Sequence, residues 1–174
     1  MPSDIPRSII ICDKNPVVRT GLVDIISRDG RFSVVAAVAS GAAFLELIAR
    51  EPTGIAIIGW ALPDMTGGDV LSLLKARQIT TRTIVYTGEP GDEIVRRTIR
   101  AGGWGFMSKS DEPEVLLETI STVSHGRVSF PYVDMDDEAH DPLSVLTVRE
   151  RELLAALADG WSNLQIAARI GISR

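Results

Sequence analysis

Short apolar runs that alternate with segments of helical periodicity limit the fold of this chain more than any other feature. The runs are continuous rather than alternating in polarity, which is typical of parallel strands buried on both faces. Between them, apolar residues recur at helical spacing, as at Val18, Leu22, Ile25 and Ile26. The pattern predicts an α/β fold, a doubly wound five-stranded parallel sheet with right-handed crossovers. The predicted strands are Ser8–Cys12, Phe32–Ala39, Ile55–Ile58, Thr83–Thr87 and Gly105–Met107.

Composition excludes several classes of protein. Because 45% of the 174 residues are hydrophobic, the chain can bury a core, which excludes wholesale disorder. A single cysteine, Cys12, excludes a disulfide framework and a cysteine-rich zinc site. No run reaches the ~18 apolar residues of a membrane span, and the first residues lack the order of a signal peptide. These observations predict a cytoplasmic protein with no membrane partner.

Charge divides the chain into three predicted parts. Residues 126–143 contain one basic residue, Arg127, against five acidic ones, a net charge of −4 within a total of −5. This stretch has two prolines and no sustained periodicity, so we predict an acidic linker. Residues 1–125 then form the domain that contains the sheet, and residues 144–174 form a second, shorter part.

The polar residues that follow the predicted strands are expected to meet at one edge of the sheet. In a sheet of strand order 2-1-3-4-5, ligands bind at the carboxyl ends of the strands, where the order reverses between strands 1 and 3. Asp13 and Lys14 follow the first strand, Gly59 follows the third, and Thr87 and Lys109 end the fourth and fifth. We refer to these five residues as the rim site.

No motif of a common enzyme class accompanies the rim site. The sequence lacks the GxxxxGK, GxGxxG, GxSxG and HExxH patterns. We therefore predict neither an enzyme nor a bound cofactor. Trp60 and Trp104 are expected to pack against helices rather than to stack on a ligand. Cys12 is expected to act as a small buried hydrophobe.

Five segments carry a resemblance to a known family. Residues 8–124 resemble the receiver domain of bacterial response regulators, and residues 144–174 resemble the start of a LuxR-type helix-turn-helix domain. Together they resemble the NarL/FixJ class of two-component transcription factors, which implies a flavodoxin-like receiver, a DNA-binding transcriptional regulator and a homodimer. The segments are IIICDKNPVVRTGL from residue 9, ALPDMTGGDVL from residue 61, IVYTGEP from residue 84, AGGWGFMSK from residue 101 and LTVRERELLAALADGWSNLQIAARIGISR from residue 146.

The resemblance also implies roles for residues of the rim site. In the family, an acidic pair after strand 1 and an aspartate after strand 3 bind Mg²⁺, and the strand-3 aspartate accepts a phosphoryl group from a histidine kinase. By position, Asp13 matches the first acid, Thr87 matches the hydroxyl that contacts the phosphoryl group, and Lys109 matches the lysine that does so. Phe106 matches the aromatic residue that changes rotamer on activation.

Two positions depart from the family pattern. Lys14 replaces the second acid, and Gly59 replaces the phosphoacceptor aspartate. Asp13 would then face Lys14 and Lys109, a net charge of +1, which disfavours a hard dication that needs oxygen ligands. Glycine has no side-chain oxygen and forms no acyl phosphate, and Asp64, further along the same loop, is a poor substitute. We therefore predict no metal site and no phosphorylation at the usual position.

Two mechanisms remain open for such a receiver. In the first, it works by phosphorylation-independent dimerisation or conformation; in the second, a small and possibly anionic molecule binds the altered crevice. Lys14 likewise has two interpretations, because its ammonium either pairs with Asp13 in place of a metal or points to solvent. On the predicted fourth helix, a basic set of side chains forms either salt bridges between subunits or a solvated face: Arg96, Arg97 and Arg100.

Two capping boxes predict short helices in the last part of the chain. Thr147–Glu150 and Ser162–Gln165 each begin an amphipathic segment, and Asp159-Gly160 separates the two. The resemblance places the base-reading residues on a following recognition helix, which this sequence does not reach because it ends at Arg174. The DNA-contacting residues are therefore unknown from the sequence, and DNA is the expected partner of the complete protein.

Overall fold

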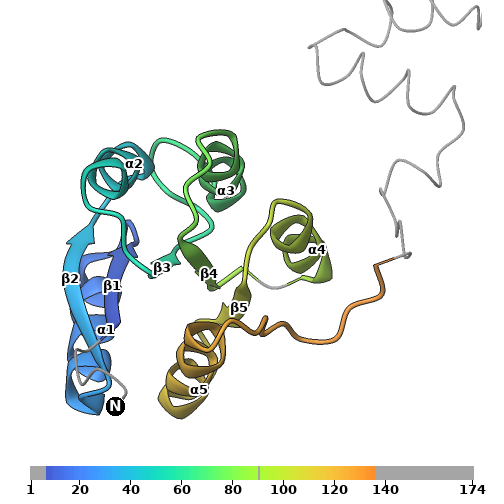
Figure 1. The fold of residues 1–174 in the computed structure, drawn as a ribbon. Helices are drawn as coiled ribbons and strands as arrows, with labels where there is room; N and C mark the ends of the chain where they lie inside the picture. The colour runs from blue at the N-terminus through green and yellow to red at the C-terminus, as the bar shows by residue number, and fades with distance from the viewer. Residues whose placement is uncertain (1–6, 90, 136–174) are drawn as a thin grey trace, which may run out of the picture. The chain divides into compact units, whose positions relative to one another are not determined.

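A computed structural model describes residues 7–89 and 91–135 of the chain, and this part contains one five-stranded sheet (Figure 1). The strand order is β2-β1-β3-β4-β5, and all four pairings are parallel. Both features confirm the predicted doubly wound sheet. The elements are β1 Arg7–Cys12, α1 Pro16–Asp29, β2 Phe32–Val38, α2 Gly41–Arg50, β3 Ile55–Ile58, α3 Gly67–Ala76, β4 Arg82–Thr87, α4 Asp92–Arg100, β5 Gly105–Ser108 and α5 Pro113–Ser124.

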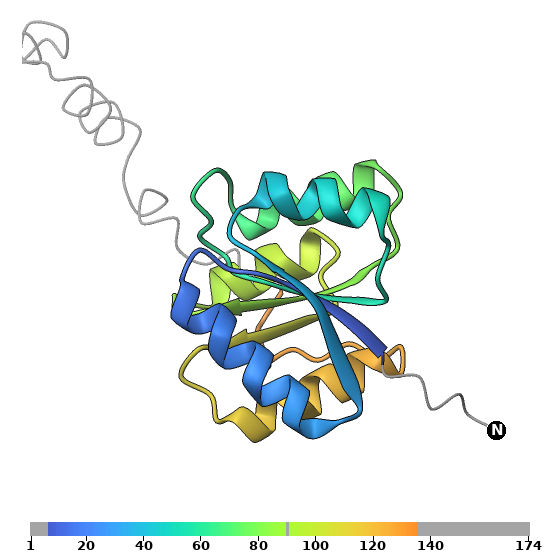
Figure 2. The ribbon, with the colours of Figure 1, turned by 90° about the vertical axis from the view of Figure 1, so that its left-hand side faces the viewer.

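Helices cover both faces of the sheet (Figure 2). α1 and α5 lie on one face, and α2, α3 and α4 lie on the other. Successive residues of β1 alternate between two buried clusters, Ile9 and Ile11 on the α1–α5 side, Ile10 and Cys12 on the opposite side. Because both faces are covered, a polar residue in the central strands would be buried on either face, which explains the continuous apolar runs.

Residue choice fixes the ends of α1. The side chain of Asn15 accepts a hydrogen bond from the backbone N–H of Val17 at 2.9 Å, and Pro16 occupies the first helical position, where no N–H is needed. The helix ends at Gly30, whose φ of 73° lies in the left-handed region that glycine adopts without strain. α1 therefore begins three residues after Asp13, and its position fixes the loop that carries the first rim-site residues.

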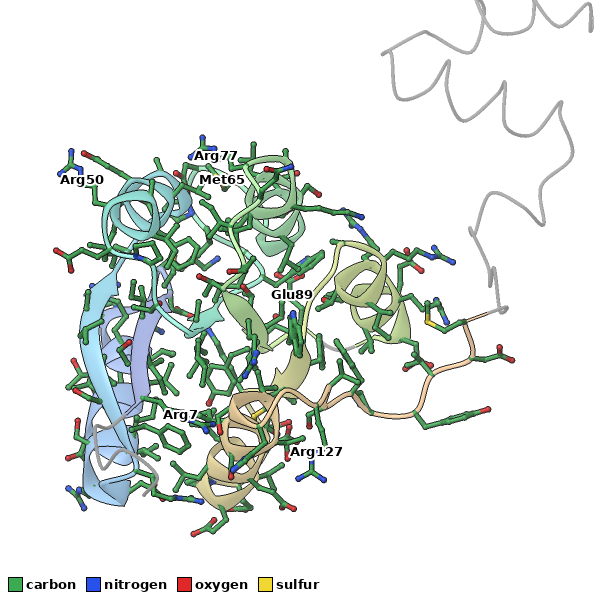
Figure 3. The ribbon with its side chains drawn as sticks, viewed as in Figure 1. Arg7, Arg50, Met65, Arg77, Glu89 and Arg127 are labelled. Carbon is green, nitrogen blue, oxygen red and sulfur yellow. The ribbon has the colours of Figure 1, made fainter. Side chains whose placement is uncertain are left out.

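The chain turns back after α5 and runs beside β5 (Figure 1). Gly126 makes the turn with a φ of 79°. The backbone N–H of Ser129 donates to the carbonyl of Trp104, and the N–H of Phe106 donates to the carbonyl of Ser129, both at 2.9 Å. The first residues of the predicted linker therefore pair with the outer edge of the sheet, which composition did not indicate. Figure 3 labels Arg127 beside α5, at the start of this returning segment.

The remaining predictions about organisation fall partly outside the described residues. The chain divides into two compact units between Val133 and Asp134, within the predicted linker. The helices predicted within residues 144–174 lie outside the described residues. In the described part, no helix has both the length and the apolar character needed to cross a membrane.

Candidate functional site at the carboxyl ends of the strands

The sheet itself positions the backbone of the rim site. The N–H of Asp13 donates to the carbonyl of Val38 at 3.1 Å, and the N–H of Gly59 donates to the carbonyl of Cys12 at 2.7 Å. The N–H of Lys109 donates to the carbonyl of Thr87 at 2.8 Å. These residues thus continue the hydrogen-bond ladders one step beyond the strands. The structure brings Asp13, Gly59, Thr87 and Lys109 together at one edge, as the sequence predicts.

Asp13 is buried, and both of its carboxylate oxygens have partners. Only 2% of the residue is exposed. Its Oδ2 accepts a hydrogen bond from Lys109 Nζ at 2.6 Å, and its Oδ1 accepts one from the backbone N–H of Asn15 at 2.8 Å. A buried carboxylate needs such compensation because water no longer solvates it. The ion pair therefore joins the end of β1 to the end of β5.

Gly59 lies directly against this carboxylate. A β-carbon on residue 59 would lie 2.8 Å from Asp13 Oδ2 and 3.4 Å from Asp13 Cγ. The first distance is too short for a carbon–oxygen contact, so any larger residue at position 59 requires Asp13 to move. The Asp13 carboxylate thus fills the space into which a side chain at position 59 would project.

Lys14 does not take part in the ion pair. Its side chain is exposed, and the partner of Asp13 within the described residues is Lys109. Of the two interpretations of Lys14, the exposed one matches this arrangement. The backbone around Lys14 is held instead by Arg19, whose Nη1 donates to the carbonyls of Asp13 at 2.7 Å and Lys14 at 3.2 Å. Sequence reasoning did not identify Arg19.

Thr87 makes a hydrogen bond with the following loop, and Phe106 packs against a buried cluster. Thr87 is buried, and its Oγ1 accepts a hydrogen bond from the backbone N–H of Glu89 at 3.0 Å. Figure 3 labels Glu89 in the loop that leads from β4 to α4. Phe106 is partly buried against the cluster on the α2–α3 side of the sheet. Whether Phe106 changes rotamer stays a prediction.

Tyr86 lies next to Lys109 at the rim. The Nζ of Lys109 lies 5.7 Å from the centre of the Tyr86 ring, within reach of a cation–π interaction. Burial raises the pKa of the Tyr86 hydroxyl, and the negative charges of Asp111 and Asp13 raise it further. Tyr86 is therefore neutral at physiological pH and supplies an aromatic surface beside the ammonium.

The Asp64 carboxylate accepts hydrogen bonds from the start of α2. Its Oδ1 accepts a hydrogen bond from the N–H of Gly41 at 2.9 Å, and its Oδ2 accepts one from the N–H of Ala42 at 2.8 Å. These bonds, first that of Ala42 and then that of Gly41, lower the pKa of the Asp64 carboxyl. Asp64 thus anchors the start of α2, together with the Ser40 side chain, which accepts from the N–H of Ala43.

The rim site does not fit a bound Mg²⁺ ion. Mg²⁺ is held by several oxygen ligands, usually including one or two carboxylates. Here the one rim-site carboxylate is paired with an ammonium, Gly59 offers no side-chain oxygen, and Lys14 adds positive charge. In the described part of the chain, no three His, Cys, Asp or Glu side chains are grouped so that they could hold a metal.

Two further sequence predictions are confirmed close to the rim. Trp60, 5% exposed, belongs to the buried cluster between the sheet and the α2 and α3 helices. Cys12 is fully buried in β1, its Sγ donates to the carbonyl of Ser40, and burial raises the pKa of its thiol to about 12. Both side chains therefore belong to the core.

A five-stranded sheet of this order, with Asp13, Thr87 and Lys109 at the carboxyl ends of its strands, is the arrangement expected of a receiver domain. Residues 9–121 match the response regulator receiver domain family, and residues 144–174 match the luxR family of bacterial regulatory proteins. The chain belongs to the response regulators, as a DNA-binding transcriptional regulator in which a receiver precedes a LuxR-type segment.

Curated relatives span almost the whole chain. The chain is 57% identical over 174 residues to the probable transcriptional regulatory protein SgaR of Hyphomicrobium methylovorum, covering 100% of this chain and 82% of that protein. It is 33% identical over 181 residues to the nitrate/nitrite response regulator protein NarP of Escherichia coli K12, covering 99% of this chain and 84% of the relative. These relatives are regulators rather than enzymes.

Solved structures show the same fold. The receiver domain of the putative response regulator NarL from Mycobacterium tuberculosis matches with a TM-score of 0.68 and 25% identity, over 70% of this chain and 98% of that one. A LuxR-family two-component response regulator from Aurantimonas sp. SI85-9A1 matches with a TM-score of 0.69 and 22% identity, over 85% of this chain and 99% of that one.

Proposed function

We propose that this protein is a transcriptional regulator whose receiver is not phosphorylated on the usual aspartate. Its receiver would act by phosphorylation-independent dimerisation or through a fixed conformation. The observation that carries the proposal is the contact between Gly59 and Asp13. Position 59 has no nucleophile, and the Asp13 carboxylate fills the space beside it, with 2.8 Å between Oδ2 and a β-carbon placed on residue 59.

The other rim-site groups support the same proposal. Phosphoryl transfer needs cations and donors that are available to the transferred group. Lys109 Nζ is paired with Asp13, which lowers the positive charge available to a phosphoryl group, whereas Thr87 Oγ1 accepts the N–H of Glu89 and keeps its own O–H as a donor. The ammonium of Lys109 on Asp13 Oδ2 also repels a cation that approaches this carboxylate. The site therefore resembles a closed ion pair more than a receptive phosphorylation site.

A ligand-gated receiver is the less favoured candidate for the same reason. An anionic ligand would be attracted to unpaired positive charge. The half-buried ammonium of Lys109 is neutralised by Asp13 at 2.6 Å, and the other lysine of the rim site, Lys14, is exposed. No specific observation in the described residues favours a small-molecule site there.

Labelling with a small phosphodonor tests the proposal. The 174-residue protein is incubated with ³²P-labelled acetyl phosphate, with and without Mg²⁺, and base-labile label is measured. We expect no Mg²⁺-dependent label and no change in oligomeric mass by light scattering after treatment. Stoichiometric label on the native protein, or a mass that changes with the phosphodonor, would falsify the proposal.

A pair of double variants sharpens this experiment. Lys14→Asp with Gly59→Asp restores both missing carboxylates, whereas Lys14→Asp with Gly59→Ala restores only one and is the matched control. Both place a β-carbon against Asp13, so both require its carboxylate to shift. We expect Mg²⁺-dependent label in the first variant alone. Equal label in the two would mean that another residue accepts the phosphoryl group, which contradicts the proposal.

A further inference from the structure

α4 is attached to the rest of the receiver by few apolar contacts. The structure describes all of its residues, and Val95 is the one apolar side chain among those that α4 buries. Ile94 is partly buried against the same cluster as Trp60. At its start, Gly91 provides no side-chain cap. Because burial of apolar surface is the main stabilising contribution, polar contacts must hold α4 in place to an unusual degree.

Trp60 offers such a contact, in the loop that follows Gly59. Its indole packs closely on the first turn of α3, which two glycines begin. A β-carbon on Gly67 would lie 3.3 Å from Trp60 Cε3, and one on Gly68 would lie 3.0 Å from Trp60 Cη2. The loop is closed by a hydrogen bond from the N–H of Gly67 to the carbonyl of Trp60 at 2.6 Å. The indole is therefore held in one place relative to α3.

Arg97 reaches this indole from α4. Its guanidinium carbon lies 5.1 Å from the centre of the Trp60 ring, which is the distance of a cation–π contact. Arg97 is also close enough to Asp69 for its positive charge to lower the pKa of that carboxyl, after the larger effect of the hydrogen bonds from Thr66. Asp69 and Thr66 form the capping box of α3. One α4 side chain thus interacts with two groups on or beside α3.

We propose that Arg97 is a positioning residue that holds α4 against the Trp60 loop, so that a contact of the chain itself, rather than a group bound at residue 59, sets the position of α4. The regulatory meaning of this contact rests on the proposed function. The contact itself does not, since it involves no rim-site side chain. It also gives Arg97 a role within one chain, besides the two that the sequence left open for the basic residues of α4.

Hydrogen exchange of the 174-residue protein, followed by mass spectrometry, tests the positioning role. Arg97→Met removes the charge and keeps most of the side-chain length, and Arg97→Lys restores a cation. Arg100→Met is the matched control, because Arg100 lies on the same helix, is exposed and makes no cation–π contact within the described residues. We expect exchange in the α4 peptides to rise about two- to fivefold in Arg97→Met, the range that an exposed cation–π contact provides. Arg97→Lys should recover part of the protection.

Gly68→Ala tests the contact from its other partner. Alanine is a better helix former than glycine, so this substitution should stabilise or leave unchanged an α3 that is independent of Trp60. Its β-carbon would instead push on Trp60 Cη2 and move the indole away from its present position. We therefore expect faster exchange in α4 here as well, although Gly68 belongs to α3.

The outcomes separate this proposal from the proposed function. Two results would overturn the positioning role. One is hydrogen exchange in α4 that is the same in Arg97→Met and in Arg100→Met. The other is exchange that rises equally in α4 and in α5 of Arg97→Met. Phosphodonor labelling of the native protein would overturn the proposed function and leave the exchange result standing. Loss of α4 protection in Arg97→Met with partial recovery in Arg97→Lys supports the positioning role whichever way the labelling experiment ends.

Discussion

α4 and α5 lie on either side of β5, but different kinds of contact hold them in place (Figure 1). α5 buries Leu116, Ile120 and Val123 in the cluster that it shares with α1. α4 buries Val95 and relies on polar contacts such as that of Arg97 with Trp60. α5 is therefore fixed by the hydrophobic core, whereas single polar substitutions should be able to shift α4.

The largest expected difference comes from truncating a core residue on each helix. Leu116→Ala on α5 should lower the free energy of unfolding by about 3 kcal/mol, because it leaves a cavity in a closed core. Ile94→Ala on α4 removes a partly buried side chain and should cost roughly a third as much. Urea unfolding followed by circular dichroism measures both. Equal losses would mean that α4 is anchored as firmly as α5.

Arg82 provides a polar anchor for α5 and gives the next largest effect. Its Nη1 donates to the carbonyls of Val123 at 3.1 Å and Ser124 at 2.9 Å, and its guanidinium lies 5.1 Å from the Trp104 ring centre. Arg82→Met should cost about 2 kcal/mol, because charged hydrogen bonds to the last carbonyls of the helix are lost.

Arg77→Met is the matched control for Arg82→Met. Arg77 is exposed on the outside of the molecule in Figure 3 and makes no ion pair within the described residues. Its substitution should change the free energy of unfolding by less than about 0.5 kcal/mol. If the two variants unfold at the same urea concentration, then Arg82 does not anchor α5 and the contrast between the helices rests on apolar burial alone.

The start of α2 supplies a smaller, pH-dependent contribution to the stability of the fold. The folded protein lowers the pKa of Asp64, so its ionised form stabilises the fold above the unfolded value of 3.8. That contribution is lost as the pH falls through the lower folded pKa. Asp64→Asn should therefore lower Tm at pH 7, and the difference from the native protein should disappear at the acid end of the range. A difference that persists unchanged to the lowest pH at which both proteins remain folded would contradict this origin.

The smallest expected effect is the modification of Cys12 by a thiol reagent in the native protein. Burial raises its pKa to about 12, so the thiolate fraction at pH 8 is on the order of 10⁻⁴. We expect a thiol reagent to modify Cys12 only after unfolding. The same resistance in Arg97→Met would show that loosening α4 leaves β1 intact. Rapid labelling of that variant would mean that α4 and β1 open together.

Local patterns predicted the sheet, because each strand and each helix has a recognisable pattern of apolar residues over a short stretch of sequence. The continuous run Ile9–Cys12 predicted a strand buried on both faces, and alternate residues do enter the two clusters. The positions of Asp13 and Lys109 at one edge followed from strand order alone. Polarity and periodicity were sufficient for these features because burial imposes them directly.

Partnerships between distant residues were not predictable in the same way. Lys14, adjacent in sequence, was one candidate partner of Asp13, but Lys109, 96 residues away, is the residue that pairs with it. The choice depends on the direction in which each side chain leaves its strand end, which no local pattern encodes. The importance of Gly59 as space for Asp13, and the contact of Arg97 with Trp60, depend on the same three-dimensional detail.

The pairing of Ser129 with β5 bears on how such proteins are assembled in evolution from exchangeable modules. A gene fusion that joined a foreign segment directly after α5 would leave the Trp104 carbonyl and the Phe106 N–H at the sheet edge without their partners. A fusion placed after Phe130 would carry those partners along. The unit that can be exchanged as a receiver therefore extends past the end of α5. Fusion points that give a stable protein should lie after Phe130.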